Sequence, residues 1–261
     1  MADLDVGGKR VLVRLDLNVP LKAQPADGQD AAMGERVVGD DTRIRASLPT
    51  LERLLAGGAT LVLMSHLGRP KGGPSDEFRL GPVARRLSEL LGVEVRYLAS
   101  SGPASAEQQA FVHDAPAGSV TLLENTRFDT REERNDPALA RVLASYADLY
   151  VDDAFGSAHR AHASTDGVAR LLPNAAGELM TAELEALGML VDSPERPFVV
   201  VLGGAKVSDK LAVIESLLTR ADTIVIGGAM AYTFIKALGG DVGDSLVEDD
   251  MLGTAVDIMR R

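Results

Sequence analysis

Short apolar runs rich in β-branched residues recur along the chain, and helical patterns separate most of them. The runs are nearly continuous in their apolar character, which is typical of strands buried on both faces of a parallel sheet. Strands that alternate with helices imply right-handed crossovers and a parallel sheet covered by helices. The predicted strands lie at 10–19, 59–66, 93–98, 120–125, 149–155, 198–204 and 223–228, and the predicted helices at 43–56, 79–91, 137–147, 208–220 and 229–238.

The segment 171–197 interrupts this alternation, because it holds a helical pattern of about 15 residues between Pro173 and Pro194 and is expected to add no strand. We therefore predict an α/β chain of two parallel-sheet (Rossmann-like) domains with this helix at their boundary. The two strands after this segment are too few for an independent doubly wound domain, so the second domain is expected to be incomplete. The predicted limits are 1–172 for the first domain, 173–196 for the boundary helix and linker, and 197–261 for the partial second domain.

Composition excludes several classes of function. The formal net charge of −11 and the 4% of aromatic residues argue against a partner of nucleic acid. The chain has no cysteine, which excludes disulfides, thiolate zinc sites and cysteine nucleophiles. The acidic start MADLDVGGKR is unlike a secretory signal, and no run of about 18 apolar residues could span a bilayer. We expect a cytoplasmic protein without a membrane partner.

Basic residues follow several of the predicted strands. Ligands of an open parallel sheet bind beyond the carboxyl ends of its strands, and Arg127 stands directly after the run 120–125. Clustered arginines repel one another unless an anion neutralises them, and the guanidinium fork matches phosphate and carboxylate. We therefore predict a ring of cations that binds a small, multiply anionic ligand. The candidate residues are Asp16, Asn18, Arg43, His66, Arg69, Arg127, His159 and Arg160.

Two glycine pairs mark a second candidate site, in the second predicted domain. Each pair ends a predicted strand and precedes a predicted helix, the first of which begins near Ser208. Glycines let a ligand approach the backbone, and a helix N-terminus offers N–H donors to an anion. Two lysines bracket the first turn, so we predict phosphate binding there. The acidic run 247–251, farther along the same domain, is expected to be a solvated helix start. The candidate residues are Gly203, Gly204, Lys206, Lys210, Gly227 and Gly228.

Familiar nucleotide templates are missing from the sequence. It contains no G-x-x-x-x-G-K-[ST] and no G-x-G-x-x-G, which argues against a P-loop enzyme and a dinucleotide cofactor. Three alternatives stay open beside an enzyme that acts on the ligands of these two sites. One is a protein that only binds a phosphorylated acid, and another is a scaffold without a small-molecule site. The third is a metal hydrolase built on Asp152, Asp153, His159 and His162.

Seven segments of the chain resemble phosphoglycerate kinases and occur in that family's order, from about Lys9 to about Asp244. The resemblance implies two doubly wound domains that move about a hinge helix. The first domain would bind 3-phosphoglycerate or 1,3-bisphosphoglycerate, and the second ADP or ATP with Mg²⁺, for reversible phosphoryl transfer in glycolysis. The segments are KRVLVRLDLNVP, DDTRIRASLPT, SHLGRPKG, LLENTRFDTREERND, VDDAFGSAHRAHAST, GGAKVSDKL and IGGAMAYTF.

The same resemblance implies a role for each candidate residue. The catalytic pair would be Arg43, which stabilises the phosphoryl group in flight, and Lys206, which with Lys210 contacts the nucleotide phosphates. The four glycines of the two pairs would line the nucleotide cleft. The glycerate and its 3-phosphate would be held by Asp16, Asn18, His66, Arg69, Arg127, His159 and Arg160.

Chains of this family continue beyond the position of residue 261, with later strands and an aspartate for Mg²⁺. The resemblance therefore implies a fragment that contains no protein ligand for the metal and that turns over slowly or not at all by itself. It also implies a monomer when the protein is full length.

Overall fold

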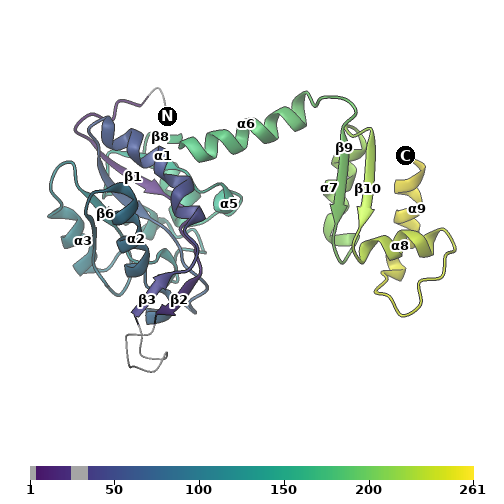
Figure 1. Cartoon of the computed structure of the whole chain (residues 1–261), viewed down its shortest axis with the longest axis horizontal. Helices are drawn as coiled ribbons and strands as arrows, with labels where there is room; N and C mark the ends of the chain where they lie inside the picture. The colour runs from purple at the N-terminus through teal and green to yellow at the C-terminus, as the bar shows by residue number, and fades with distance from the viewer. Residues whose placement is uncertain (1–3, 25–34) are drawn as a thin grey trace. The chain divides into compact units, whose positions relative to one another are not determined.

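The computed structural model describes residues 4–24 and 35–261. It falls into two compact units, Met1–Leu184 and Glu185–Arg261, called the first and the second unit below (Figure 1). The division lies inside helix α6 (Glu178–Asp192), whose 15 residues match the predicted helix. The α/β, Rossmann-like class with parallel sheets is confirmed. The predicted domain limits and the hinge role of α6 stay predictions.

A parallel sheet of six strands forms the centre of the first unit, in the order β5-β6-β4-β1-β7-β8. The central pair is β1 and β4, in which Val13 pairs with Leu63, while β1 pairs with β7 on its other side. The strands are β1 (Arg10–Arg14), β4 (Thr60–Met64), β5 (Val95–Tyr97), β6 (Val120–Leu122), β7 (Leu149–Asp152) and β8 (Asn174–Ala176).

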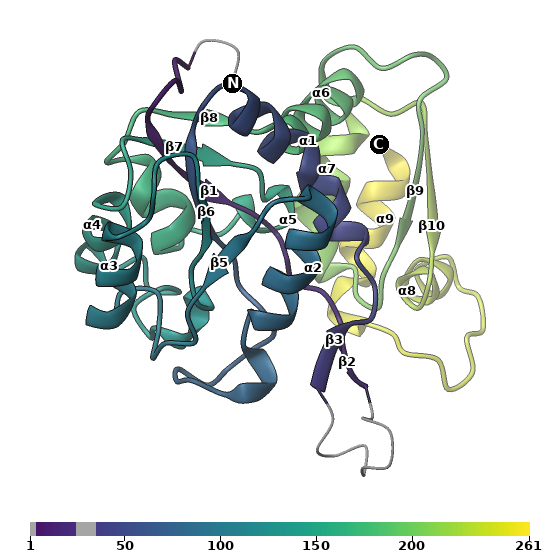
Figure 2. The same cartoon turned by 60° about the vertical axis from the view of Figure 1, so that its left-hand side comes forward.

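Helices cover both faces of this sheet (Figure 2). Side chains alternate between the faces along a strand, so Val11 and Val13 join one buried cluster with α1 and α2. Leu12 joins a second cluster with α3 and α4 on the opposite face. The helices are α1 (Thr42–Ala56), α2 (Gly81–Leu91), α3 (Ala106–His113) and α4 (Pro137–Ala144), with a single turn α5 (Phe155–Ala158).

Some sequence-based expectations differ from the structure. The first strand ends at Arg14, although Leu15 and Leu17 beyond it are fully buried. The prediction that 171–197 adds no strand was wrong, because β8 pairs with β7. Helix α3 was not predicted, nor was the antiparallel pair β2 (Leu21–Gln24) and β3 (Glu35–Val38).

The second unit contains one parallel pair of strands, β9 (Val199–Gly203) and β10 (Thr223–Gly227). One face of this pair packs on a buried cluster that includes Ile214 and Phe234. The opposite face is open, since Val201 is 74% exposed and its neighbour Val225 is 46% exposed. The helices of the unit are α7 (Leu211–Leu218), α8 (Met230–Ala237) and α9 (Leu252–Arg260).

Helix α6 is anchored at its start by side chains of the first unit. The hydroxyl of Thr50 accepts a hydrogen bond from the backbone N–H of Glu178 at 2.8 Å. Asp153 Oδ1 accepts from the N–H of Met180 at 3.1 Å, and Arg53 forms an ion pair with the Glu178 carboxylate. These bonds satisfy N–H groups that the first turn of a helix leaves without partners. Among the described helices, none is both long and apolar enough to cross a membrane.

Candidate functional site

His66 lies in the loop that follows β4, at the carboxyl edge of the parallel sheet. Its side chain is buried, and its Nδ1 lies 3.1 Å from a terminal nitrogen of Arg14, the last residue of β1. A guanidinium can only donate, so Nδ1 accepts this hydrogen bond and the ring proton resides on Nε2. Burial, and after it the positive field of the arginines nearby, Arg14 first, together lower the pKa of His66 to about 2. His66 is therefore neutral.

Three of the four predicted ring arginines contribute to the field at His66. Their order of effect is Arg127, Arg160 and Arg43, after the stronger influence of Arg14. The structure thus places these side chains near enough to one imidazole for their charges to act on it, although Arg43 lies in the first turn of α1, Arg127 in a 3-10 turn and Arg160 in a loop after α5. Arg69, the fourth, is exposed in the loop after β4, and His159 is exposed and accepts a long hydrogen bond of 3.4 Å from Arg160 Nε.

Arg127 is the most buried of the predicted ring cations, with 9% of its side chain exposed. It lies in a single 3-10 turn after β6, where the Asn125 side chain accepts from its backbone N–H at 3.1 Å. A terminal nitrogen of Arg127 donates to the carbonyl oxygen of Gly68 at 2.7 Å. Burial lowers the pKa of the guanidinium, which stays charged because its ordinary value is above 12.

Asp16 and Asn18 occupy the loop after β1. Asp16 Oδ2 lies 2.5 Å from a terminal nitrogen of Arg43, which therefore has an internal counter-ion. Asn18 Oδ1 accepts from the backbone N–H of Gly68 at 2.9 Å. Gly68 thus ties the loop of Asn18 to the side chain of Arg127, through its N–H on one side and its carbonyl oxygen on the other.

The sequence analysis did not predict a buried series of hydrogen bonds that links Arg14 to Glu132. Arg14 Nε donates to Ser164 Oγ at 3.0 Å, and the Glu132 carboxylate accepts from the Ser164 N–H at 3.0 Å and hydroxyl at 2.5 Å. Glu132 Oε1 also lies 3.8 Å from Nδ1 of His162, whose pKa burial lowers. A buried arginine needs a carboxylate nearby, and Glu132 supplies that charge through Ser164. The arginine inside an apolar run, RVLVR, was the available signal.

The two glycine-rich turns of the second unit lie against each other. Met230 N–H donates to the Gly204 carbonyl at 3.0 Å. Gly228 has φ +70°, and a Cβ placed there would come within 2.7 Å of the same carbonyl oxygen. Glycine is therefore required at Gly228 both by its conformation and by the close approach of the two turns. Lys206 and Lys210 are exposed beside them.

A carboxylate occupies the helix start that was predicted to bind phosphate. Glu248 accepts from the backbone N–H groups of Val207 at 2.5 Å and Ser208 at 3.1 Å, and from the Ser208 hydroxyl at 2.6 Å. The Ser208 hydroxyl is the first cause that lowers the pKa of Glu248. The expected helix start in the run 247–251 is present, because Asp249–Met251 form a 3-10 turn that leads into α9. Glu248 differs from that expectation, since it also caps a helix that begins 40 residues earlier.

The alternative of a metal hydrolase finds no support. Asp153 is used to hold the start of α6, and Asp152 Oδ1 accepts from the Ala154 N–H at 3.0 Å. Over 4–24 and 35–261, no group of three or more histidine, aspartate or glutamate side chains is arranged to hold a metal ion. His159 instead accepts from Arg160, and His162 lies beside Glu132.

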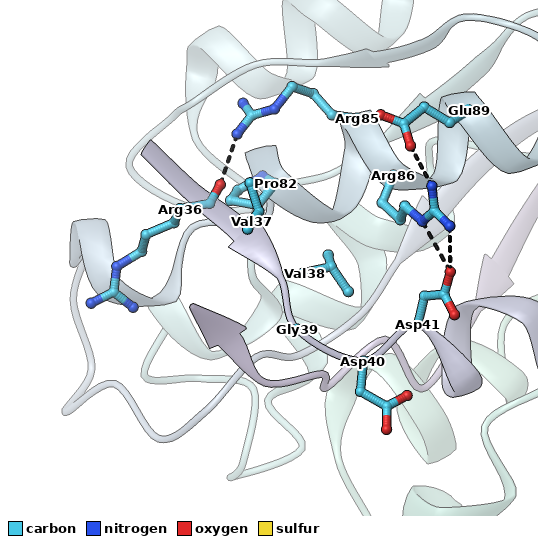
Figure 3. Close-up of a pocket in the computed structure, with 10 residues that line it drawn as sticks. All are labelled: Arg36, Val37, Val38, Gly39, Asp40, Asp41, Pro82, Arg85, Arg86 and Glu89. Carbon is cyan, nitrogen blue, oxygen red and sulfur yellow. Dashed lines mark hydrogen bonds and ion pairs between the residues drawn. The ribbon is translucent and has the colours of Figure 1, made fainter. Parts of the chain in front are cut away.

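A cavity of about 480 Å³ lies away from the predicted site, between β3 and α2 (Figure 3). Arg86 binds Asp41 at 2.7 Å and Glu89 at 2.5 Å, and Arg85 donates to the Arg36 carbonyl at 3.0 Å. The cations of this cavity are thus engaged with neighbours of their own. Its walls include none of the predicted site residues, so it is not the candidate site.

Comparison with known proteins agrees with this geometry. The family model described as phosphoglycerate kinase matches residues 1–261. The chain is 53% identical over its whole length to the phosphoglycerate kinase of Deinococcus radiodurans and 56% identical to that of Thermus thermophilus. It covers 60% and 63% of these two proteins, so it spans a little over three fifths of their length.

Solved structures lead to the same family. All of the chain superposes on 62% of the phosphoglycerate kinase of Coxiella burnetii, with a TM-score of 0.83 at 37% identity. It also superposes on 64% of the enzyme of Pyrococcus horikoshii, with a TM-score of 0.79 at 33% identity. Sequence and fold therefore agree over the full 261 residues, and the chain belongs to the phosphoglycerate kinase family.

Proposed function

We propose that the protein acts in reversible phosphoryl transfer between 1,3-bisphosphoglycerate and ADP, which yields 3-phosphoglycerate and ATP. Its membership of the phosphoglycerate kinase family supports this reaction. The observation that carries the proposal is the gathering of Arg127, Arg160 and Arg43 around His66 at the carboxyl edge of the sheet. Such a set of cations suits an acid that carries both a carboxylate and a phosphate.

In this proposal the first unit holds the phosphorylated acid. Arg127 and Arg160 neutralise the anionic groups, and neutral His66 offers its Nε2–H as a hydrogen-bond donor without adding charge. Arg43 has an exposed side chain and can turn from Asp16 to the phosphoryl group as it transfers. The remaining binding residues proposed are Asp16, Asn18, Arg69 and His159.

The second unit would bind the nucleotide through its glycine turns and lysines. Lys206 and Lys210 supply positive charge, and the four glycines Gly203, Gly204, Gly227 and Gly228 let the phosphates approach the backbone. Phosphoryl transfer depends on alignment and on stabilisation of the charge in flight, so Arg43 and Lys206 are the catalytic pair of the proposal. Transfer requires the two bound substrates to meet.

Mg²⁺ is expected to accompany the nucleotide. The described residues offer no cluster of carboxylates that fits the metal, so we assign it no protein ligand here and derive no step from it. A cytoplasmic location and a monomeric state of the full-length protein, without nucleic acid or membrane as partner, belong to the same proposal.

Binding without turnover is the second candidate for this chain by itself. Glu248 already occupies the N–H groups of Val207 and Ser208, which are the donors predicted to meet a nucleotide phosphate. The open face of β9 and β10 also favours weaker order in the nucleotide unit than in the acid-binding unit. In this case the acid binds and MgADP does not.

Calorimetric titration tests the proposal directly. The chain is titrated with 3-phosphoglycerate and, separately, with MgADP, beside Arg127→Ala and the control Arg170→Ala. Loss of a charge-assisted hydrogen bond predicts that Arg127→Ala weakens binding of the acid about ten- to hundredfold. Arg170 is an exposed partner of Asp166, so its removal should leave binding unchanged. A folded chain that binds neither ligand contradicts the proposal.

A further inference from the structure

The pairing of Arg127 with Glu133 satisfies charge but not hydrogen bonding. Arg127 Nε lies 3.2 Å from Glu133 Oε1, close enough for an ion pair. The same Nε is buried, and no acceptor in the described part of the chain meets hydrogen-bond geometry with it. A buried N–H donor without an acceptor costs free energy. The Nε–H of Arg127 is therefore available to donate to an acceptor on a ligand.

A cavity of about 290 Å³ lies beside this ion pair. Its cationic walls come from Arg127, Lys71 and Arg134. Of its two carboxylates, Asp129 is committed to Arg131, which it binds through both oxygens at 2.7 and 2.9 Å. Glu133 is thus the carboxylate of the cavity that neutralises Arg127, and the space beside it can admit an anion or receive the displaced side chain.

The two partners of the pair differ in freedom. Arg127 is 9% exposed and is fixed by its bond to the Gly68 carbonyl, whereas the Glu133 side chain is 63% exposed. An exposed carboxylate can return to water at little cost, because ion pairs with a solvent-exposed partner contribute little to stability. When an anion approaches, the arginine stays and the carboxylate leaves.

The other ion pair of the ring has the opposite arrangement. In the pair of Arg43 and Asp16, the arginine side chain is 53% exposed and the aspartate 17%. There the cation is the mobile partner. Displacement of a carboxylate is therefore specific to Glu133 and does not apply to every carboxylate at the ring.

We propose that Glu133 is a resident counter-ion of Arg127, which the anionic group of a bound ligand displaces, so that Glu133 lowers the affinity of the ring for anions. This inference rests on the proposed function of the ring. A phosphate oxygen would accept from the unused Nε–H, which the Glu133 carboxylate does not. The ligand thereby gains a hydrogen bond that the resident carboxylate lacks, and a phosphate dianion also carries more charge.

The test compares Glu133→Gln with Glu52→Gln in titrations with inorganic phosphate and with 3-phosphoglycerate. Glu52 is exposed on α1, and its substitution changes the net charge equally. Removal of the competing carboxylate predicts binding about two- to fivefold tighter for both ligands in Glu133→Gln, as the loss of a surface ion pair allows. Equal or weaker binding, or an equal gain in Glu52→Gln, overturns the inference.

Two further measurements separate the possible outcomes. The Nε–H resonance of Arg127 should shift on addition of phosphate in both wild type and Glu133→Gln, and an unmoved resonance contradicts the displacement. If wild type binds 3-phosphoglycerate and Arg127→Ala weakens it while Glu133→Gln has no effect, the inference alone fails. If neither wild type nor Glu133→Gln binds the acid, the inference and the proposed function fail together. Glu133→Ala repeats the comparison with a second variant.

Discussion

The parallel strands of the two units differ in how their two faces are covered. In the first unit, β1 and β4 carry helices on both faces, and residues such as Leu61 and Val62 are fully buried. In the second, β9 and β10 have a buried cluster on one face, while Val199 and Val201 on the other are 50% and 74% exposed. Parallel sheets are usually covered on both sides, so the second unit departs from the rule that the first obeys.

This difference indicates which of the two units contributes more to the free energy of folding. Burial of apolar surface is the main favourable term in folding, at about 25 cal/mol per Å². Valine and leucine side chains of the parallel strands are buried in the first unit. In the second unit they are only partly buried, so they contribute less to the free energy of folding. The proposed anion-binding ring lies in the first unit, whereas the glycine turns lie in the second.

The largest expected effect compares Leu61→Ala with Val201→Ala. Leu61 is buried in the centre of the sheet, so its truncation leaves a cavity and should cost about 2–5 kcal/mol of unfolding free energy. Val201 is mostly exposed, so its truncation should change that free energy by at most about 0.5 kcal/mol. Urea titration followed by circular dichroism measures both. Equal losses would show that the open face of β9 is covered in solution.

The next effect concerns pH and the first unit. The pKa of His66 is about 2 when folded, below its ordinary value of 6.5. Between these values the unfolded chain binds a proton that the folded chain does not, so the free energy of unfolding falls as the pH drops below 6.5. The slope from this group is at most about 1.4 kcal/mol per pH unit.

His66→Gln should remove this slope between pH 6.5 and 4.5, while the control His113→Gln should retain it. His113 is exposed on α3, so the comparison isolates the buried imidazole. Unfolding in urea at several pH values supplies the measurement. Because the pKa of His162 is also lowered, some slope can remain, but a slope as steep in His66→Gln as in wild type would show that His66 takes up protons in the folded state.

Apolar runs in the sequence predicted the strands of both units well, because burial on two faces leaves a continuous apolar pattern. They failed where buried residues do not belong to a strand and where a strand has no apolar pattern. Leu15 and Leu17 are buried but lie in a loop, which shortened β1. Strand β8 has the sequence NAA, with no β-branched residue, and exists through its pairing with β7. Such pairing is a tertiary property that a local pattern does not contain.

The sequence likewise predicted only part of the candidate site. The positions of Arg127 and Arg160 followed from the rule that ligands bind at the carboxyl edge of a parallel sheet. The partners of the carboxylates in the two units did not follow from it. Glu132 reaches Arg14 through Ser164, and Glu248 reaches the N–H of Ser208 across 40 residues. Charge compensation at this range depends on the fold, so a sequence shows the cations more readily than their counter-ions.

A smaller effect tests the glycine turns of the second unit. Gly228→Ala should lower the unfolding free energy by about 1–3 kcal/mol, because it combines positive φ with a Cβ placed against the Gly204 carbonyl. The control Gly239→Ala has φ +84° and open space around its Cβ, so it carries the conformational cost of about 1–2 kcal/mol alone. Heat denaturation of both variants measures the difference. Equal losses would mean that the two turns do not touch in solution.

The smallest effect on stability concerns the open face of the second unit itself. The double variant Val201→Thr, Val225→Thr should keep the unfolding free energy within about 0.5 kcal/mol, because both side chains already face water. It should nevertheless reduce self-association, since exposed apolar strands invite contact with other chains. Sedimentation velocity over a range of concentrations measures this. The matched variant Leu202→Thr alters the face that packs on Ile214 and should destabilise instead. If the double variant proves as costly as Leu202→Thr, the two faces of β9 are equally buried, and the contrast between the two units does not hold in solution.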